Sequence, residues 1–186
     1  PADAHPSEKN AIYDEYAEKR KWFYENKRGY NMNNAIGITV IKATNQDDLG
    51  ASKFFGAPVL PSKWENIFAE DELFLCQIRL SEISELDIDD KLPHTGYLYI
   101  FLHMDSYPYQ PHILYYDGEP DMVIDDFNDT FDEYINGDDA WLMNFAEVED
   151  DAEGIKLFGI PANWDNEDEA PRLLLQYDPL ASAMSF

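Results

Sequence analysis

Apolar and polar residues alternate with the period of a β-strand along much of the chain. Residues 35–42 alternate, with Ile36, Ile38 and Val40 on one face, and residues 141–148 alternate at Trp141, Met143 and Phe145. Residues 73–80, 96–103, 112–116 and 172–177 are further strand-like segments. The segment 96–103 is nearly continuous in apolar residues, so we expect it to be central and to form a hairpin with 112–116.

Two segments follow a helical period instead. Residues 7–28 carry an apolar stripe, with Ser7 as a suitable N-cap and Gly29 directly after the last turn. Residues 125–136 also show helical spacing and are followed by glycine. The predicted fold class is therefore α+β and mostly β, with an N-terminal helix and lead-in over 1–34 and one main domain over 35–186.

A motif occurs twice in the chain. Residues 53–58 (KFFGAP) recur about a hundred residues later as 156–161 (KLFGIP), and each copy is followed by tryptophan, an acid and asparagine. Each then continues to an apolar run that contains a glutamine. These repeats, at about 53–80 and 156–180, predict a single domain built from two related β-rich halves. In each turn the glycine, Gly56 or Gly159, is expected at a positive φ or a close backbone approach, and the phenylalanine before it in the core.

The same residues resemble the YwqG-like family, a family of bacterial conserved proteins with no assigned function. The resemblance covers roughly residues 50–180. It rests on the Phe-Gly-x-Pro turn, the Leu60-Pro61 pair and tryptophan behind it, and the closing Leu-Leu-Leu-Gln run 173–176 with Asp178. One departure is Phe55-Gly56, where family members commonly have paired glycines. The resemblance implies a fold and transfers no catalytic residues.

The chain is strongly acidic, with a formal net charge of -25. It has no lysine or arginine between Lys91 and Lys156. Nucleic acids and anionic membranes need their phosphates neutralised, so this charge argues against both as partners. It favours a basic protein, a polyamine or a divalent cation, or it serves only to keep an aromatic-rich domain soluble.

The cysteine count and the lengths of the apolar segments bear on the cellular compartment of the protein. Cys76 is the single cysteine and lies within an apolar run, so no intramolecular disulfide forms and a buried thiol is expected. No segment has the ~20 apolar residues of a membrane helix, and no signal peptide is visible. We therefore predict a cytoplasmic protein.

Catalytic and metal motifs are missing from the sequence. There is no Gly-x-Ser-x-Gly elbow, Walker loop or Gly-x-Gly-x-x-Gly motif. The acidic segment 126–137 fails as an EF-hand, because Phe131 occupies the glycine position and Gly137 the final acid position. His103, Asp105 and His112 can meet across the predicted hairpin, but their spacing matches no metal motif. We therefore predict no metal, no cofactor and no catalytic residue.

Four side chains at equivalent places in the repeats are the candidate binding residues: Trp64, Gln77, Trp164 and Gln176. A glutamine in an apolar strand needs hydrogen-bond partners, and the structural interpretation is that each holds the turn of its own repeat. The functional interpretation has both amides lining a pocket between tryptophan walls. The predicted function is a non-enzymatic domain that binds a basic protein through its acidic aromatic surface. The alternative is a small-ligand binder or hydrolase with a pocket between the halves.

Overall fold

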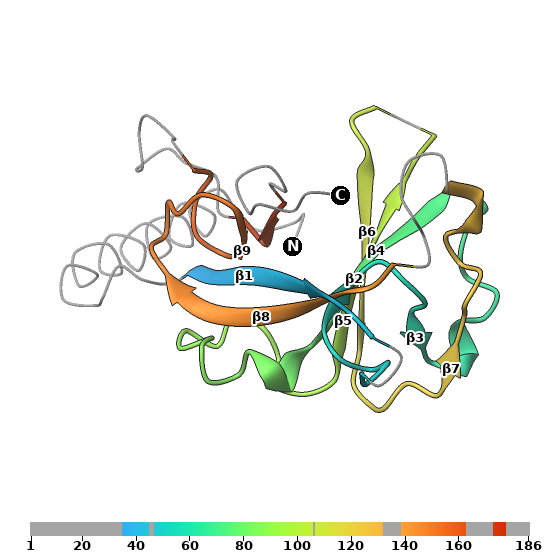
Figure 1. The fold of residues 1–186 in the computed structure, drawn as a ribbon, viewed down its shortest axis with the longest axis horizontal. Helices are drawn as coiled ribbons and strands as arrows, with labels where there is room; N and C mark the ends of the chain where they lie inside the picture. The colour runs from blue at the N-terminus through green and yellow to red at the C-terminus, as the bar shows by residue number, and fades with distance from the viewer. Residues whose placement is uncertain (1–34, 45–46, 106, 132–138, 163–172, 178–186) are drawn as a thin grey trace, which may run out of the picture. The chain divides into compact units, whose positions relative to one another are not determined.

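The computed structural model describes residues 35–44, 47–105, 107–131, 139–162 and 173–177 (Figure 1). The predicted helix over 7–28 lies outside the described residues. Within them the protein is mostly β, as the alternation predicts. The strands are β1 (Ala35–Lys42), β2 (Lys53–Phe54), β3 (Val59–Leu60), β4 (Glu72–Arg79), β5 (Tyr97–His103), β6 (Gln110–Tyr116), β7 (Met122–Val123), β8 (Trp141–Val148), β9 (Ile155–Leu157) and β10 (Leu175–Gln176).

Eight of these strands form one antiparallel sheet in the order β10-β9-β1-β8-β2-β4-β5-β6, and β3 and β7 pair separately. The predicted hairpin is confirmed, because β5 pairs with β6 from Tyr97 opposite Tyr116 to His103 opposite Gln110. The segment expected to be central, β5, lies next to the last strand of the sheet instead. That last strand, β6, contains Pro111.

Each motif copy contains a strand that pairs with a neighbouring strand on both sides. The first copy, β2, pairs with β8 on one side and β4 on the other, and Lys53 faces Gln77. The second, β9, pairs with β1 and β10, and Lys156 faces Gln176. The long strands β1 and β8 pair with each other between them. The two copies therefore occupy corresponding positions on either side of the β1–β8 pair.

The Phe-Gly turns adopt the left-handed conformation predicted for their glycines. Gly56 has φ 67° and Gly159 has φ 75°. The phenylalanine before each glycine is left-handed too, with φ 54° at Phe55 and 63° at Phe158, which is uncommon for a side chain of this size. Both rings are buried, as expected. Burial of the ring and the hydrogen bond from the phenylalanine N–H to the glutamine strand, at Leu75 O or Leu174 O, stabilise this backbone.

Each motif lysine is buried and donates to two backbone carbonyls. Lys53 Nζ bonds to Leu49 O at 2.8 Å and Ala57 O at 2.6 Å. Lys156 Nζ bonds to Asp150 O and Ala152 O, both at 2.7 Å. Burial lowers the pKa of Lys53 to about 8 and also lowers the pKa of Lys156. The ammonium groups thus replace solvent as partners for carbonyls in the loops around each turn.

Apolar side chains cover both faces of β4 and β5. On one face, Leu73, Ile100 and their neighbours join the main core with β1, β8 and β9. On the other, an aromatic cluster forms around Phe74, Tyr99 and Phe101. β4 is bulged between Phe74 and Cys76, where its register to β5 shifts.

The helix predicted over 125–136 is not formed in its described part. Residues 125–131 are a turn followed by a 3-10 helix, Asp129–Phe131, and residues 132–138 lie outside the description. Asn128 explains the difference. Its buried side chain accepts from Phe74 N at 2.8 Å and donates to Phe74 O at 3.1 Å, and thereby attaches the segment to β4.

Candidate functional site

The two glutamines have the structural role weighed in the sequence analysis. Gln77 Oε1 accepts from Val59 N at 2.9 Å, and its Nε2 donates to Leu49 O and Ala51 O, both at 3.0 Å. Gln176 Oε1 accepts from Ala162 N at 3.0 Å, and its Nε2 donates to Gly154 O at 2.8 Å. Each amide therefore joins the loop before its motif to the segment after it. The interpretation that each glutamine holds its own turn is confirmed.

Of the two candidate tryptophans, the described residues include only Trp64. Trp64 packs edge-on against Tyr99 and Tyr116 in the aromatic cluster, at centroid distances of 5.6 and 5.7 Å. Trp164 lies outside the described residues. None of Trp64, Gln77 and Gln176 lines the cavity that β4, β5 and β6 border. A binding role for these four residues stays a prediction.

That cavity lies against the main-core face of β4, β5 and β6 and has a volume of about 570 Å³. Segments next to both motif copies contribute to it, through Phe55 in the first turn and through Leu174, Leu175 and Tyr177 around β10. Among the described lining residues, only Tyr109 and Tyr177 carry a hydroxyl, and burial raises the pKa of Tyr177 to about 12. The lining residues are Phe55, Leu73, Leu75, Ile100, Leu102, Met104, Tyr109, Pro111, Ile113, Leu174, Leu175 and Tyr177.

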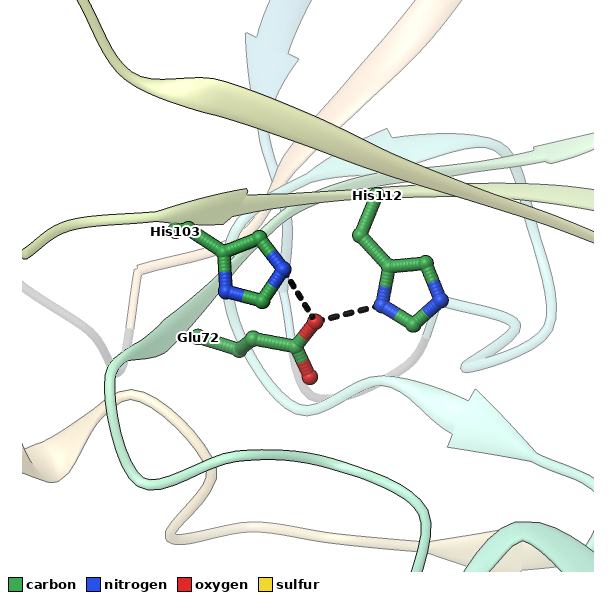
Figure 2. A group of neighbouring side chains, drawn as sticks. All are labelled: Glu72, His103 and His112. Atoms are coloured by element: carbon green, nitrogen blue, oxygen red, sulfur yellow. Dashed lines mark hydrogen bonds and ion pairs between the residues drawn. The ribbon is translucent and has the colours of Figure 1, made fainter. Parts of the chain in front are cut away.

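A second cluster joins Glu72, His103 and His112 from three adjacent strands (Figure 2). Glu72 faces His103 in the β4–β5 register, and His112 faces Phe101, two residues before His103. Strand alternation places all three on the face opposite the cavity. His103 Nε2 lies 3.3 Å from Glu72 Oε1, and His112 Nδ1 contacts the same oxygen. Both imidazole rings are thus directed at one carboxylate.

The surroundings of this cluster fix its carboxylate and leave its imidazoles accessible. The Glu72 side chain is 2% exposed, whereas those of His103 and His112 are 35% and 32% exposed. Ala69 N donates to the other oxygen, Glu72 Oε2, at 3.0 Å. Asp71 Oδ2 lies 3.4 Å from His103 Nδ1. The imidazole rings are nearly parallel, 9° apart in plane, with centroids at 5.9 Å.

Sequence reasoning found two members of this cluster and missed the third. It considered that His103 and His112 can meet with Asp105 across the hairpin, and predicted no metal site; in the structure Glu72 is the acid that joins the two histidines. Glu72 is the residue directly before the apolar run 73–80, at the end of β4 that faces the end of β5. The signal was available only from the β4–β5 register, which the hydrophobic pattern does not specify.

Searches against protein-family models, curated proteins and solved structures find no match for this chain. The YwqG-like resemblance therefore stays a prediction. No helix among the described residues is long and apolar enough to cross a membrane.

Proposed function

We propose that the domain binds a small apolar molecule in the cavity beside the two motif copies. The observation that supports this most is the cavity itself. Its volume of about 570 Å³ lies within the range of roughly 300–1,000 Å³ that is usual for small-molecule sites. Its lining is apolar except for the Tyr109 and Tyr177 hydroxyls, so a ligand with a hydrocarbon body and at most one polar end fits best.

Binding is favoured over hydrolysis. Hydrolysis of a bound molecule needs a nucleophile and a base, or an activated water, within hydrogen-bond distance of the reacting group. Among the described residues, the lining side chains include no serine, cysteine, histidine or acid. Burial raises the pKa of Tyr177 to about 12, so its hydroxyl keeps its proton at neutral pH. The proposal is therefore for a ligand-binding domain rather than for an enzyme.

The first motif copy and the strand paired with the second copy supply part of the cavity wall. The first turn supplies Phe55, whose left-handed backbone directs the ring inward, and the second copy supplies the β10 side chains through its pairing with β9. We propose that the motif copies belong to two related halves and that the ligand lies where they approach each other. β2 and β9 each pair with one long strand, β8 or β1, and with the strand that carries the glutamine, β4 or β10. This correspondence supports the relation.

A tryptophan at the cavity is expected to displace the ligand. Ile113 on β6 lines the cavity and is 43% exposed, so Ile113→Trp adds volume with little cost to the fold. Val123→Trp on β7, at a residue 47% exposed and outside the cavity, is the matched control. We expect the neutral fluorescent probe N-phenyl-1-naphthylamine to bind the parent chain and Val123→Trp saturably, one per chain, and Ile113→Trp at least 10-fold more weakly. Equal binding by both variants, or no saturable binding, would contradict the proposal.

A second candidate function follows from charge. The sequence has no lysine or arginine between Lys91 and Lys156. Two tyrosines in this segment are exposed, Tyr107 at 93% and Tyr109 at 46%. Both features favour a basic protein partner. This function suits a cytoplasmic protein, as the sequence analysis predicts.

A basic partner is expected to be retained by the immobilised chain at low salt and released at high salt. Tyr107→Ser keeps the net charge and removes an exposed aromatic side chain, so it should weaken retention if contact is specific. Mass spectrometry of the retained proteins at two salt concentrations measures both effects. Retention that does not depend on salt would contradict this candidate, and retention unchanged by Tyr107→Ser would reduce it to nonspecific ion exchange.

A further inference from the structure

We propose that Glu72, His103 and His112 bind one divalent transition-metal ion of the zinc type. This inference does not depend on the cavity, because the cluster lies on the opposite face of β4–β6. Its donor atoms, one from each side chain, all lie within 4.8 Å of one another. Two imidazoles and one carboxylate from three neighbouring strands are the donor types and number of an open zinc site, in which a water takes the fourth position.

The spacing between His103 and Glu72 fits such an ion. Two donors that each lie about 2.0–2.1 Å from zinc in tetrahedral geometry are separated from each other by about 3.3 Å. His103 Nε2 and Glu72 Oε1 are separated by 3.3 Å. The third donor, His112 Nδ1, contacts the same oxygen, so its ring has to move away from Glu72 when an ion binds between them; the His112 side chain is 32% exposed.

Neighbouring groups hold two of the ligands in the orientation that a metal needs. His103 presents Nε2 to Glu72, while its Nδ1 faces the Asp71 carboxylate at 3.4 Å. A carboxylate behind a metal-binding imidazole fixes its tautomer and raises its basicity. Ala69 N holds Glu72 Oε2 and leaves Oε1 directed at the histidines. Preformed ligands of this kind lose little conformational freedom when a metal binds.

The donor set also selects the kind of metal. Imidazole nitrogen favours zinc, cobalt, nickel and copper, whereas calcium and magnesium take oxygen ligands almost exclusively. The net charge of -25 raises the concentration of any cation near the surface and so speeds its entry. The half-exposed imidazoles provide the path from solvent.

The test is titration of the full, chelator-treated chain with Zn²⁺ by calorimetry, followed by the Co²⁺ absorption spectrum. We expect one Zn²⁺ per chain, no displacement by excess Ca²⁺ or Mg²⁺, and Co²⁺ bands of a four-coordinate site. His103→Asn and His112→Asn should each weaken Zn²⁺ binding at least 10-fold. Both residues are half-exposed, so the variants should keep the fold, which circular dichroism checks.

His94→Asn is the matched control. His94 Nε2 also faces two carboxylates, at 3.3 Å from Asp90 and 3.9 Å from Asp87, but it belongs to no group of three donors among the described residues. Its replacement should leave Zn²⁺ affinity unchanged. If the chain binds no Zn²⁺, or if His103→Asn and His112→Asn bind it as tightly as His94→Asn does, the cluster is only a hydrogen-bonded group and the proposal is wrong.

Discussion

Replacing Gln77 with leucine is expected to lower the free energy of unfolding by about 3 kcal/mol. Leucine fills most of the space of the glutamine side chain, so the loss comes from hydrogen bonds rather than from packing. The substitution removes the partner of the Val59 N–H and one donor to each of Leu49 O and Ala51 O. Gln77 is 0% exposed, so water cannot replace these bonds without opening the turn.

Gln176→Leu provides the internal comparison. Gln176 makes the corresponding bonds in the second copy but is only half-buried. Water can solvate the freed groups there, and we expect a loss of about 1 kcal/mol. Urea unfolding followed by tryptophan fluorescence measures both variants. A loss below about 0.5 kcal/mol for Gln77→Leu would show that the amide does not hold the first turn.

The free energy of unfolding is expected to rise by about 2 kcal/mol between about pH 7 and pH 9.5 because of Lys53. Burial lowers its pKa from 10.5 to about 8 in the folded chain. Above pH 8 the folded state releases this proton while the unfolded state keeps it until about pH 10.5. The unfolded state therefore binds more protons in this window, and stability increases with pH.

The rise should end near pH 10. Burial raises the pKa of Tyr99 and Tyr177, so above their ordinary pKa of about 10 the unfolded state loses protons that the folded state keeps, and stability falls. Lys53→Met should remove most of the rise, whereas Lys63→Met, at an exposed lysine, should preserve it. Urea unfolding at several pH values measures the profile. A flat profile between pH 7 and 9.5 in the parent chain would contradict a desolvated Lys53.

The strands could be predicted from sequence because their signal is local. Alternation in 35–42 and 141–148 corresponds to β1 and β8, with the bounds that the structure shows. The left-handed glycines were also predictable, since few residues other than glycine adopt that conformation without strain. The pairing partner of a strand could not be predicted in this way. Pairing of β1 with β8, across about a hundred residues, depends on the whole core rather than on either segment.

The features that escaped prediction depend on contacts between distant segments. Residues 125–136 have helical spacing, but the Asn128 side chain makes two hydrogen bonds to the backbone of Phe74, at the β4 bulge. These bonds hold the described part of the segment in a conformation other than an α-helix. The left-handed Phe55 is stabilised by burial of its ring and by Leu75 O. Glu72 joined the histidines only through the register of β4 with β5. In each case the outcome depends on a contact with another segment, which the local sequence pattern does not contain.

Pro111 has a consequence for how the chain behaves at high concentration. No strand among the described residues pairs with the outer side of β6. An open edge of this length would otherwise template the addition of a foreign strand, the first step toward aggregation. Proline has no N–H to offer, and it interrupts the row of donors near the start of the strand. Pro111 is therefore expected to disfavour self-association along this edge of the sheet, and the same residue lines the cavity.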